Sequence, residues 1–276
     1  MDNLADKVFD LRKDIVTMVY KAKAGHIGGD MSVVDALCVL YNRVMNVGPG
    51  NQDDPDRDRF VLSKGHCVEA LYAVLADKGF FDIHEVEETL CCFDSKYIGH
   101  PHNKLPGIEM CSGSLGHGLP VAVGMALAGK MDQRNYRVYT VMGDGELAEG
   151  SVWEGAMSAG HYKLDNLCAL VDRNRLQISG GTEEVMAQDD QEERWKSFGW
   201  HVIGVNGNDV EALTEAYKEA ETVKGKPTMI ISNTTKGYGV SYMENIAAWH
   251  HRVPSEEEFK QALEELEAKK EAVCNE

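Results

Sequence analysis

The distribution of apolar residues predicts a chain in which buried strands alternate with helices. Short apolar runs at 138–142, 167–171, 201–205 and 228–232 have the length of buried strands. Between the first two runs, residues 149–161 carry apolar side chains at three- and four-residue spacing, which predicts a helix. A strand, a crossover helix and a second strand form a unit whose strands are parallel. We therefore expect an α/β fold, with a mostly parallel sheet and helices on both faces.

Helical patterns also precede the first strands. Residues 4–22 place their apolar side chains on one face, which predicts an amphipathic helix. Ser32 is expected to cap a following helix over about 33–45. The most apolar stretch, 119–129, is rich in small residues and is expected to be a buried helix rather than a membrane span, because it is too short.

The C-terminal part of the sequence ends in another helical pattern. Ser255 and Glu258 have the spacing of a capping box, which predicts a helix over about 255–273. No repeat, low-complexity tract or Pro/Ser-rich linker interrupts the sequence. We expect one domain over residues 1–276.

Composition excludes several classes of function. The formal net charge of −17 disfavours binding to nucleic acids and anionic membranes, which requires basic patches. No run of 18 apolar residues predicts a membrane span, and the polar, acidic start of the sequence is unlike an export signal, so we expect a cytoplasmic protein. The seven cysteines lack zinc-site spacing, and we expect reduced, mostly buried thiols.

Polar residues follow the two strands at the centre of the sequence. Asp144 lies between two glycines just after the strand at 138–142, and Asn174 follows the strand at 167–171. The carboxyl ends of parallel strands are where open α/β sheets bind ligands. A carboxylate, an amide oxygen and a nearby backbone carbonyl are ligands that suit Mg²⁺, which completes its shell with water and phosphate oxygens. The alternative is a tight turn with no ligand.

Histidines occur repeatedly beside glycines. His26 lies in the segment AGHIGGD, and His66 ends the segment RFVLSKGH at a strand–helix junction. Glycines allow the backbone to approach a ligand closely, and a helix N-terminus attracts anions. For His26, a helix C-cap is the competing interpretation. His100 and His102 form an HPH sequence, but no third ligand lies at zinc spacing.

The central segment GDGELAEG…VDRNRLQISG resembles the thiamine diphosphate signature in its transketolase form. GHIGG, RDRFVLSKGH, GHP, SGSLGHG and the segment with Lys236 and His250 resemble further transketolase motifs, so that six motifs follow in the family's order over residues 5–252. The resemblance implies the thiamin diphosphate-binding fold, specifically its pyrophosphate-binding (PP) domain, with thiamine diphosphate and Mg²⁺ as cofactors.

The resemblance also implies roles for individual residues. The implied Mg²⁺ ligands are Asp144, Asn174 and the carbonyl of Leu176. The implied coenzyme contacts are His66, Gly113, Ser114, Leu115, Gly145, Asn174, Lys236 and His250. The implied catalytic residues are His26, His100 and His250 beside the substrate, and Glu149, which would relay protons to an acid of a partner chain. Ser114 and His117 depart from the proline and glutamine that the family has in this loop.

The resemblance covers only the pyrophosphate-binding half of a transketolase. It therefore implies the N-terminal subunit of a split enzyme that works with a separate C-terminal subunit, forming an α₂β₂ heterotetramer. The implied reaction transfers a two-carbon ketol group from a ketose phosphate to an aldose phosphate. Two alternatives remain open: another split thiamine enzyme, acting on a modified or sulfonated sugar or as a deoxyxylulose-phosphate-type synthase, and a non-catalytic Mg²⁺–phosphate binding module.

Overall fold

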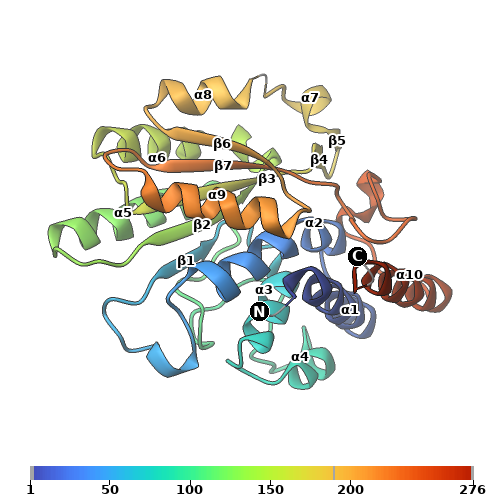
Figure 1. Cartoon of the computed structure of the whole chain (residues 1–276). Coiled ribbons are helices and arrows are strands. Elements are labelled where there is room, and N and C mark those ends of the chain that lie inside the picture. The colour runs from blue at the N-terminus through green and yellow to red at the C-terminus, as the bar shows by residue number, and fades with distance from the viewer. Residues whose placement is uncertain (1–2, 189, 275–276) are drawn as a thin grey trace.

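A five-stranded parallel sheet forms the centre of the structure, a computed structural model that describes residues 3–188 and 190–274 (Figure 1). Its strand order is β1-β2-β3-β7-β6, and every neighbouring pair is parallel. The expected parallel α/β sheet is therefore confirmed. The strands are β1 (Arg59–Leu62), β2 (Val138–Gly143), β3 (Leu167–Arg173), β6 (His201–Asn206) and β7 (Thr228–Asn233).

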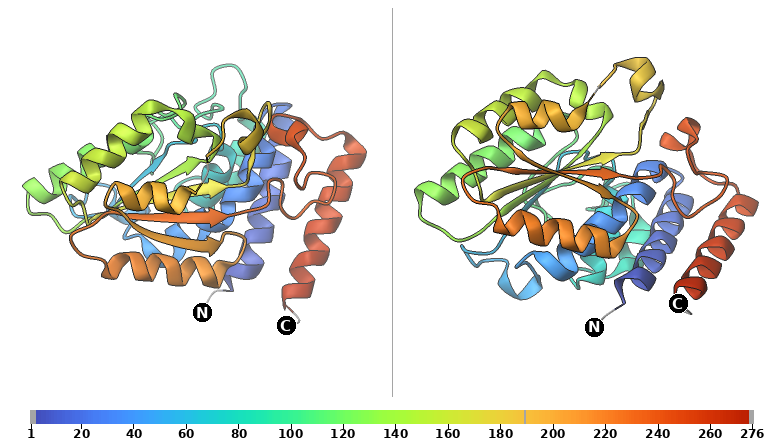
Figure 2. Two further views of the ribbon diagram at one scale, coloured as in Figure 1. Left: turned by 90° about the horizontal axis from the view of Figure 1, so that it is seen from above. Right: turned by 45° about the horizontal axis from the view of Figure 1, so that its top comes forward.

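Helices cover both faces of this sheet, as Figure 2 shows with the sheet seen nearly edge-on. One face carries α1 (Leu4–Ala22), α2 (Ile27–Val39), α3 (Val68–Asp77) and α9 (Val210–Thr222). The other carries α5 (Gly118–Met131), α6 (Gly150–His161) and α8 (Gln191–Ser197). Two further helices, α4 (Ile83–Thr89) and α10 (Glu256–Cys274), pack against α1. The shorter elements are η1 (Leu40–Val44), η2 (Pro49–Asn51), η3 (Gly145–Ala148), β4 (Leu176–Gln177), β5 (Gly180–Gly181), α7 (Thr182–Val185) and η4 (Ala247–His250).

Burial on both faces explains why the strands read as continuous apolar runs. Every residue of β2 is buried. Tyr139 and Val141 belong to the core under α1, α2 and α3, whereas Val138 and Met142 belong to the core under α5 and α6. Successive side chains on a strand point to opposite faces, so a strand covered on both sides needs apolar residues at every position.

The start of α2 differs from the expectation. Ser32 was expected to cap a helix beginning at residue 33, but α2 begins at Ile27 and continues through η1. The hydroxyl of Ser32 instead donates a hydrogen bond to Asp172 Oδ2 at 2.7 Å. Ser32 and Asp35 have the spacing of a capping box, so the local sequence favours a cap at Ser32. The hydroxyl of Ser32 bonds to Asp172 instead, and Asp172 is distant in the sequence.

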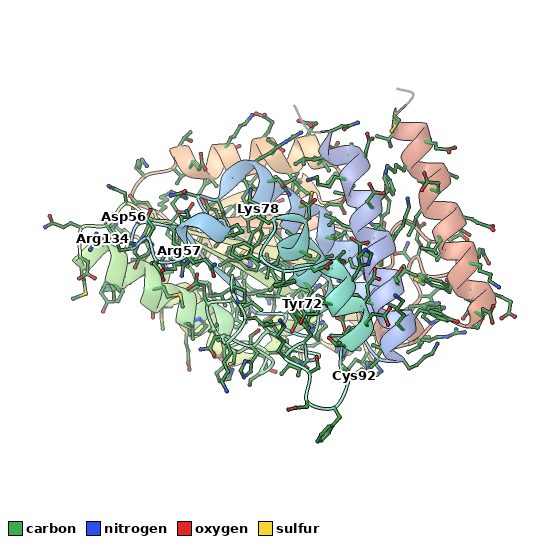
Figure 3. The ribbon with its side chains drawn as sticks, turned by 90° about the horizontal axis from the view of Figure 1, so that it is seen from below. Asp56, Arg57, Tyr72, Lys78, Cys92 and Arg134 are labelled. Atoms are coloured by element: carbon green, nitrogen blue, oxygen red, sulfur yellow. The ribbon has the colours of Figure 1, made fainter. Side chains whose placement is uncertain are left out.

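Two further expectations are corrected by the burial pattern. Cys38, Cys67 and Cys168 are buried, but Cys91, Cys92, Cys111 and Cys274 are exposed, so the thiols are not mostly buried. Cys92 lies at the edge of the molecule in Figure 3. Helix α5 is buried on one face only, with Val121 exposed on the other. None of the described helices is both long and apolar enough to cross a membrane.

The C-terminal helix is confirmed together with its cap. The backbone N–H of Ser255 donates to Glu258 Oε2 at 2.8 Å, and the N–H of Glu258 donates to Ser255 Oγ at 3.2 Å. These are the two reciprocal bonds of a capping box. Helix α10 then runs to Cys274 alongside α1. Of the expected domain over residues 1–276, residues 1–2, 189 and 275–276 lie outside the described part.

Candidate active site

A cavity of about 470 Å³ opens at the carboxyl ends of β1, β2, β3 and β7. It collects side chains from segments that are far apart in the sequence. The expected site residues that line it are His26, His66, Gly113, Leu115, Asp144, Gly145, Glu149, Asn174, Leu176, Lys236 and His250. The fold thus brings these motif residues to one place, which motif order alone does not require.

Asp144 joins the ends of the two central strands. Its carboxylate accepts hydrogen bonds from the backbone N–H of Gly145, at 2.8 Å, and from that of Arg175. The amide oxygen of Asn174, the residue before Arg175, accepts a hydrogen bond from the backbone N–H of Leu176 at 3.1 Å. Burial raises the pKa of Asp144 to about 6, and the nearby Asp172 carboxylate adds to this rise. A site that disfavours the Asp144 anion in this way gains from a bound cation.

The donor set fits a magnesium ion held together with a diphosphate. Asp144 offers a carboxylate, Asn174 an amide oxygen and Leu176 a backbone carbonyl, and all three line the cavity. The Leu176 carbonyl already accepts a hydrogen bond from the ammonium group of Lys236 at 3.1 Å, so it faces a positive charge. No group of three or more His, Cys, Asp or Glu side chains suited to a metal occurs among the described residues. Hard oxygen ligands completed by phosphate are the pattern of Mg²⁺ sites.

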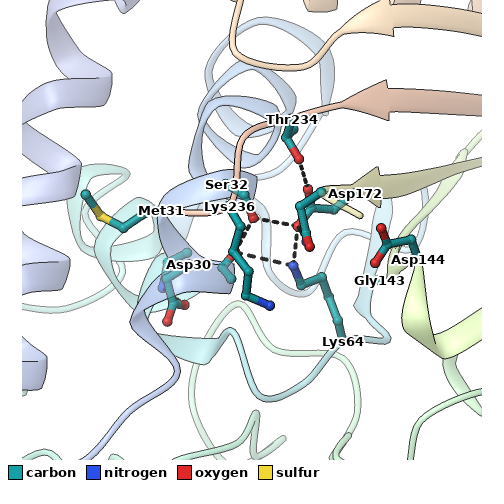
Figure 4. A network of polar contacts seen from close by, with 12 residues as sticks. Asp30, Met31, Ser32, Lys64, Gly143, Asp144, Asp172, Thr234 and Lys236 are labelled. Carbon is teal, nitrogen blue, oxygen red and sulfur yellow. Dashed lines mark hydrogen bonds and ion pairs between the residues drawn. The ribbon is translucent and has the colours of Figure 1, made fainter. Parts of the chain in front are cut away.

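Asp172, fully buried behind the cavity, holds several of these elements in place (Figure 4). Its carboxylate forms an ion pair with Lys64 and accepts hydrogen bonds from Ser32 and Thr234. It also accepts a bond from the Asn174 Nδ2 atom at 3.1 Å, which fixes the orientation of the Asn174 amide group. Burial raises the pKa of Asp172, but the charge of Lys64 and the hydrogen bonds from Lys64, Thr234 and Ser32 together outweigh this effect, so the pKa is lowered.

The four expected histidines lie close together at one side of the site. The His26 ring centroid lies 5.2 Å from that of His66, 5.7 Å from that of His250 and 6.3 Å from that of His100. Burial, together with the neighbouring imidazoles and the charge of Lys236, lowers the pKa of His26 to about 4 and that of His250 to about 3. The rings of His26 and His250 are therefore neutral at pH 7, and each has one donor and one acceptor nitrogen.

Lys236 and His250 meet although they come from different segments. The Lys236 ammonium lies 2.8 Å from His250 Nδ1. Burial lowers the pKa of Lys236 to about 8, and the charge of Lys64 contributes in the same direction. A neutral imidazole acceptor on one side and the Leu176 carbonyl on the other hold this ammonium at the cavity wall.

Three expected site residues lie at the rim of the cavity. His100 contacts the loop at Gly113, where a Cβ atom would lie 3.0 Å from the imidazole, but it does not line the cavity itself. Ser114 is exposed, with its hydroxyl 3.3 Å from His117 Nδ1. Glu149 is exposed and lines the cavity.

Glu146 and His251 are among the residues near the cavity that were not expected from the sequence. Glu146, almost fully buried, accepts hydrogen bonds from Ser63 and from the backbone N–H groups of Gly116 and Gly143, and so links three motifs. His251 is exposed and places its ring 4.6 Å from that of His26. Each had one indication in the sequence: Glu146 lies two residues after Asp144, and His251 directly follows His250.

Comparisons with known proteins agree with this geometry. Residues 5–273 match the family described as transketolase, thiamine diphosphate binding domain. The chain is 53% identical to an apulose-4-phosphate transketolase subunit of Phocaeicola vulgatus, over 92% of this chain and 90% of that protein. It is 43% identical to a 6-deoxy-6-sulfo-D-fructose transketolase subunit of a Clostridium species, over 93% of this chain and 94% of that protein.

Solved transketolases share the fold but are much longer. The transketolase of Campylobacter jejuni superimposes with a TM-score of 0.90 at 30% identity, over 99% of this chain but only 45% of that one. The transketolase of Leishmania mexicana gives a TM-score of 0.84 at 29% identity, over 97% of this chain and 46% of that one. The chain therefore spans less than half of these enzymes. It belongs to the transketolase family of transferases, and it corresponds to their thiamine diphosphate-binding domain.

Proposed function

We propose that this protein is the thiamine diphosphate-binding subunit of a split transketolase, formed as a single domain and active with a separate C-terminal subunit. The observation that carries the proposal is the convergence of Asp144, Asn174 and the Leu176 carbonyl with His66 on one cavity. The relatives that match over nearly their full length are themselves named as subunits of transketolases.

The proposed coenzyme site uses the groups that line the cavity. Asp144, Asn174 and the Leu176 carbonyl would hold Mg²⁺, and Gly145 and His66 would contact the diphosphate. The ammonium group of Lys236 lies at the cavity wall, beside the Leu176 carbonyl, and would neutralise part of the phosphate charge. Gly113 to Leu115 would offer backbone groups to the pyrimidine. Bound thiamine diphosphate supplies the electron sink that allows the bond between C2 and C3 of a ketose to break.

The histidines would bind and orient the substrate. His26, His100 and His250 are neutral at pH 7, because burial lowers the pKa of each. A neutral imidazole donates one hydrogen bond to a sugar oxygen and accepts a proton from a hydroxyl group. Glu149 at the mouth would pass a proton to a carboxyl of the partner subunit.

The proposed reaction transfers a two-carbon ketol group from a ketose phosphate to an aldose phosphate. The names of the relatives indicate which ketoses to test first, namely apulose 4-phosphate and 6-deoxy-6-sulfofructose besides common ketose phosphates. An α₂β₂ heterotetramer is the proposed assembly. A non-catalytic Mg²⁺–phosphate module has less support, because it gives no reason for a ring of neutral histidines beside the anion site.

Co-purification tests the proposal directly. The chain is expressed with the subunit that co-purifies from a native extract, and ketol transfer is measured for the chain alone, for the partner alone and for the complex. We expect thiamine diphosphate-dependent and Mg²⁺-dependent transfer only with the complex. Full activity of the chain alone would refute the split enzyme, and a complex that binds no thiamine diphosphate would favour the non-catalytic module.

A further inference from the structure

Two buried carboxyl groups lie behind the central histidines of the cavity. His26 directly precedes α2, and His66 precedes the N-cap residue of α3. Asp30 lies in the first turn of α2, and Glu69 lies in the first turn of α3. Both side chains are fully buried, with 0% exposure. Each helix therefore presents a histidine to the cavity and a carboxyl group to the other helix.

The contacts of these carboxyl groups connect the two helices. Asp30 Oδ1 accepts the backbone N–H of Ala70 at 2.9 Å, and so caps α3, because the N-cap residue Cys67 provides no side-chain bond. The Asp30 and Glu69 carboxyl groups are close enough for each to affect the pKa of the other. A Cβ atom on Gly25 would lie 2.9 Å from Glu69 Oε1, so this carboxyl group lies directly under the backbone that leads into His26.

Two ionised carboxylates do not fit this environment. Among the residues that the structure describes, Asp30 Oδ2 and both oxygens of Glu69 have no hydrogen-bond partner, and the backbone N–H groups of Glu69 and His26 approach Glu69 without completing a bond. Two adjacent buried anions without donors are strongly unfavourable. A proton on Glu69 removes one charge and supplies the missing donor to Asp30. Burial raises the pKa values of both Asp30 and Glu69, that of Glu69 well above its ordinary value.

We propose that Asp30 and Glu69 share one proton and act as a positioning pair that joins the start of α2 to the start of α3. The remaining charge lies between two helix N-termini, which favour an anion. The other titratable groups that face the pair are Lys64 and Cys67 beside Asp30, and Tyr72 and Cys91 beside Glu69. Only Lys64 carries a charge among these, and it is paired with Asp172.

The pair fixes the separation of the two histidines that lie above it. His26 and His66, 5.2 Å apart between ring centroids, move with the helix starts that the pair connects. This positioning role rests on the proposed function, whereas the shared proton does not. The two parts are therefore tested by different measurements.

The pH dependence of unfolding tests the shared proton on the full chain. In the unfolded chain the two carboxyl groups have ordinary pKa values of 3.8 and 4.5, so both are ionised above about pH 5.5. The folded chain keeps one proton, and unfolding releases it. The pair therefore makes the unfolding equilibrium constant rise about tenfold per pH unit between about pH 5.5 and 7.5, so stability falls as pH rises. Glu69→Gln replaces the O–H donor by an N–H donor and should reduce the released protons by about one.

Glu264→Gln, on the exposed side of α10, is the matched control and should leave the slope unchanged. If Glu69→Gln has the wild-type slope, the shared proton is refuted. Asp30→Asn provides a second route in case Glu69→Gln does not fold. Its amide oxygen still accepts the Ala70 N–H and its NH₂ group donates to Glu69, so the slope should fall by the same amount. A wild-type slope in Asp30→Asn would equally refute the proposal.

Activity of the complete two-subunit enzyme tests the positioning role. Glu69→Ala should lower kcat about tenfold, and Glu69→Gln should restore it, because the glutamine retains the bond to Asp30. Equal kcat values for wild type, Glu69→Ala and Glu69→Gln would refute the positioning role and leave the shared proton standing. Absence of ketol transfer in the wild-type complex would instead count against the proposed function.

Discussion

His26 and Asp144 face the same cavity, yet their substitution should have different consequences. Asp144 offers the only side-chain carboxylate of the proposed Mg²⁺ ligands, so Asp144→Ala should weaken Mg²⁺-dependent binding of thiamine diphosphate about 100-fold or more. His26 is proposed to contact the substrate, so His26→Ala should change coenzyme affinity by less than about threefold and lower kcat about 10²- to 10⁴-fold. Calorimetric titration of the two-subunit enzyme and steady-state kinetics measure these effects. Equal losses of coenzyme affinity in both variants would contradict the assigned roles.

The sequence predicts the side chains that face the cavity better than those that support them. Motifs identified His26, His66 and Asp144, because the chemistry of a ligand limits which residue types can stand there. Asp172 and Glu146 were missed, because their partners Lys64 and Ser63 come from distant segments and no local pattern connects them. Buried polar residues take their role from such contacts, which only the fold defines.

At the scale of the elements, Arg12 connects helices α1 and α2 to the loop after β7. Its fully buried guanidinium forms an ion pair with Asp35 of α2 and donates to the carbonyl of Tyr238 at 3.1 Å. Arg12→Leu leaves the Asp35 carboxylate buried without its ion pair. We expect the free energy of unfolding in urea to fall by about 3–5 kcal/mol.

The matched control is Arg134→Leu. Arg134 and Asp56 form an ion pair at 3.3 Å with 44% of each side chain exposed, at the edge of the molecule in Figure 3. Exposed pairs contribute about 0–1 kcal/mol, because water screens the charges. Similar losses in the two variants would show that the Arg12 pair is no more important than a surface contact.

The elements were predictable where apolar periodicity decides them. Strands β2, β3, β6 and β7 and helices α1, α6 and α10 agree with their apolar patterns within about two residues, because burial on one or both faces imposes those patterns. The start of α2 was wrong, since Gly28 and Gly29 mark close packing rather than a loop. A Cβ atom on Gly28 would lie 2.6 Å from the carbonyl of Trp249, and one on Gly29 would lie 2.7 Å from Cys67 Sγ.

At the scale of the whole molecule, the charge of the chain limits what it can bind alone. The formal net charge is −17, and the two lysines that line the cavity are Lys64 and Lys236. The charge of Lys64 is compensated by Asp172, so Lys236 is the lysine left to attract the anionic groups of coenzyme and substrate. If the proposed function holds, a sugar phosphate would need further positive charge from the proposed partner subunit.

Ile178 offers a way to test where this partner binds. It lines the cavity mouth with 75% of its side chain exposed, an arrangement that a partner closing the cavity would bury. Ile178→Asp loses this apolar burial and places a charge in the contact, so the affinity for the C-terminal subunit should fall by about 2 kcal/mol, roughly 30-fold. Met131→Asp is the control, because Met131 is 76% exposed at the far end of α5. Sedimentation analysis of mixtures measures both affinities, and the melting temperature of each free variant shows that it is folded. Unchanged affinity in Ile178→Asp, or an equal loss in Met131→Asp, would place the partner on another surface.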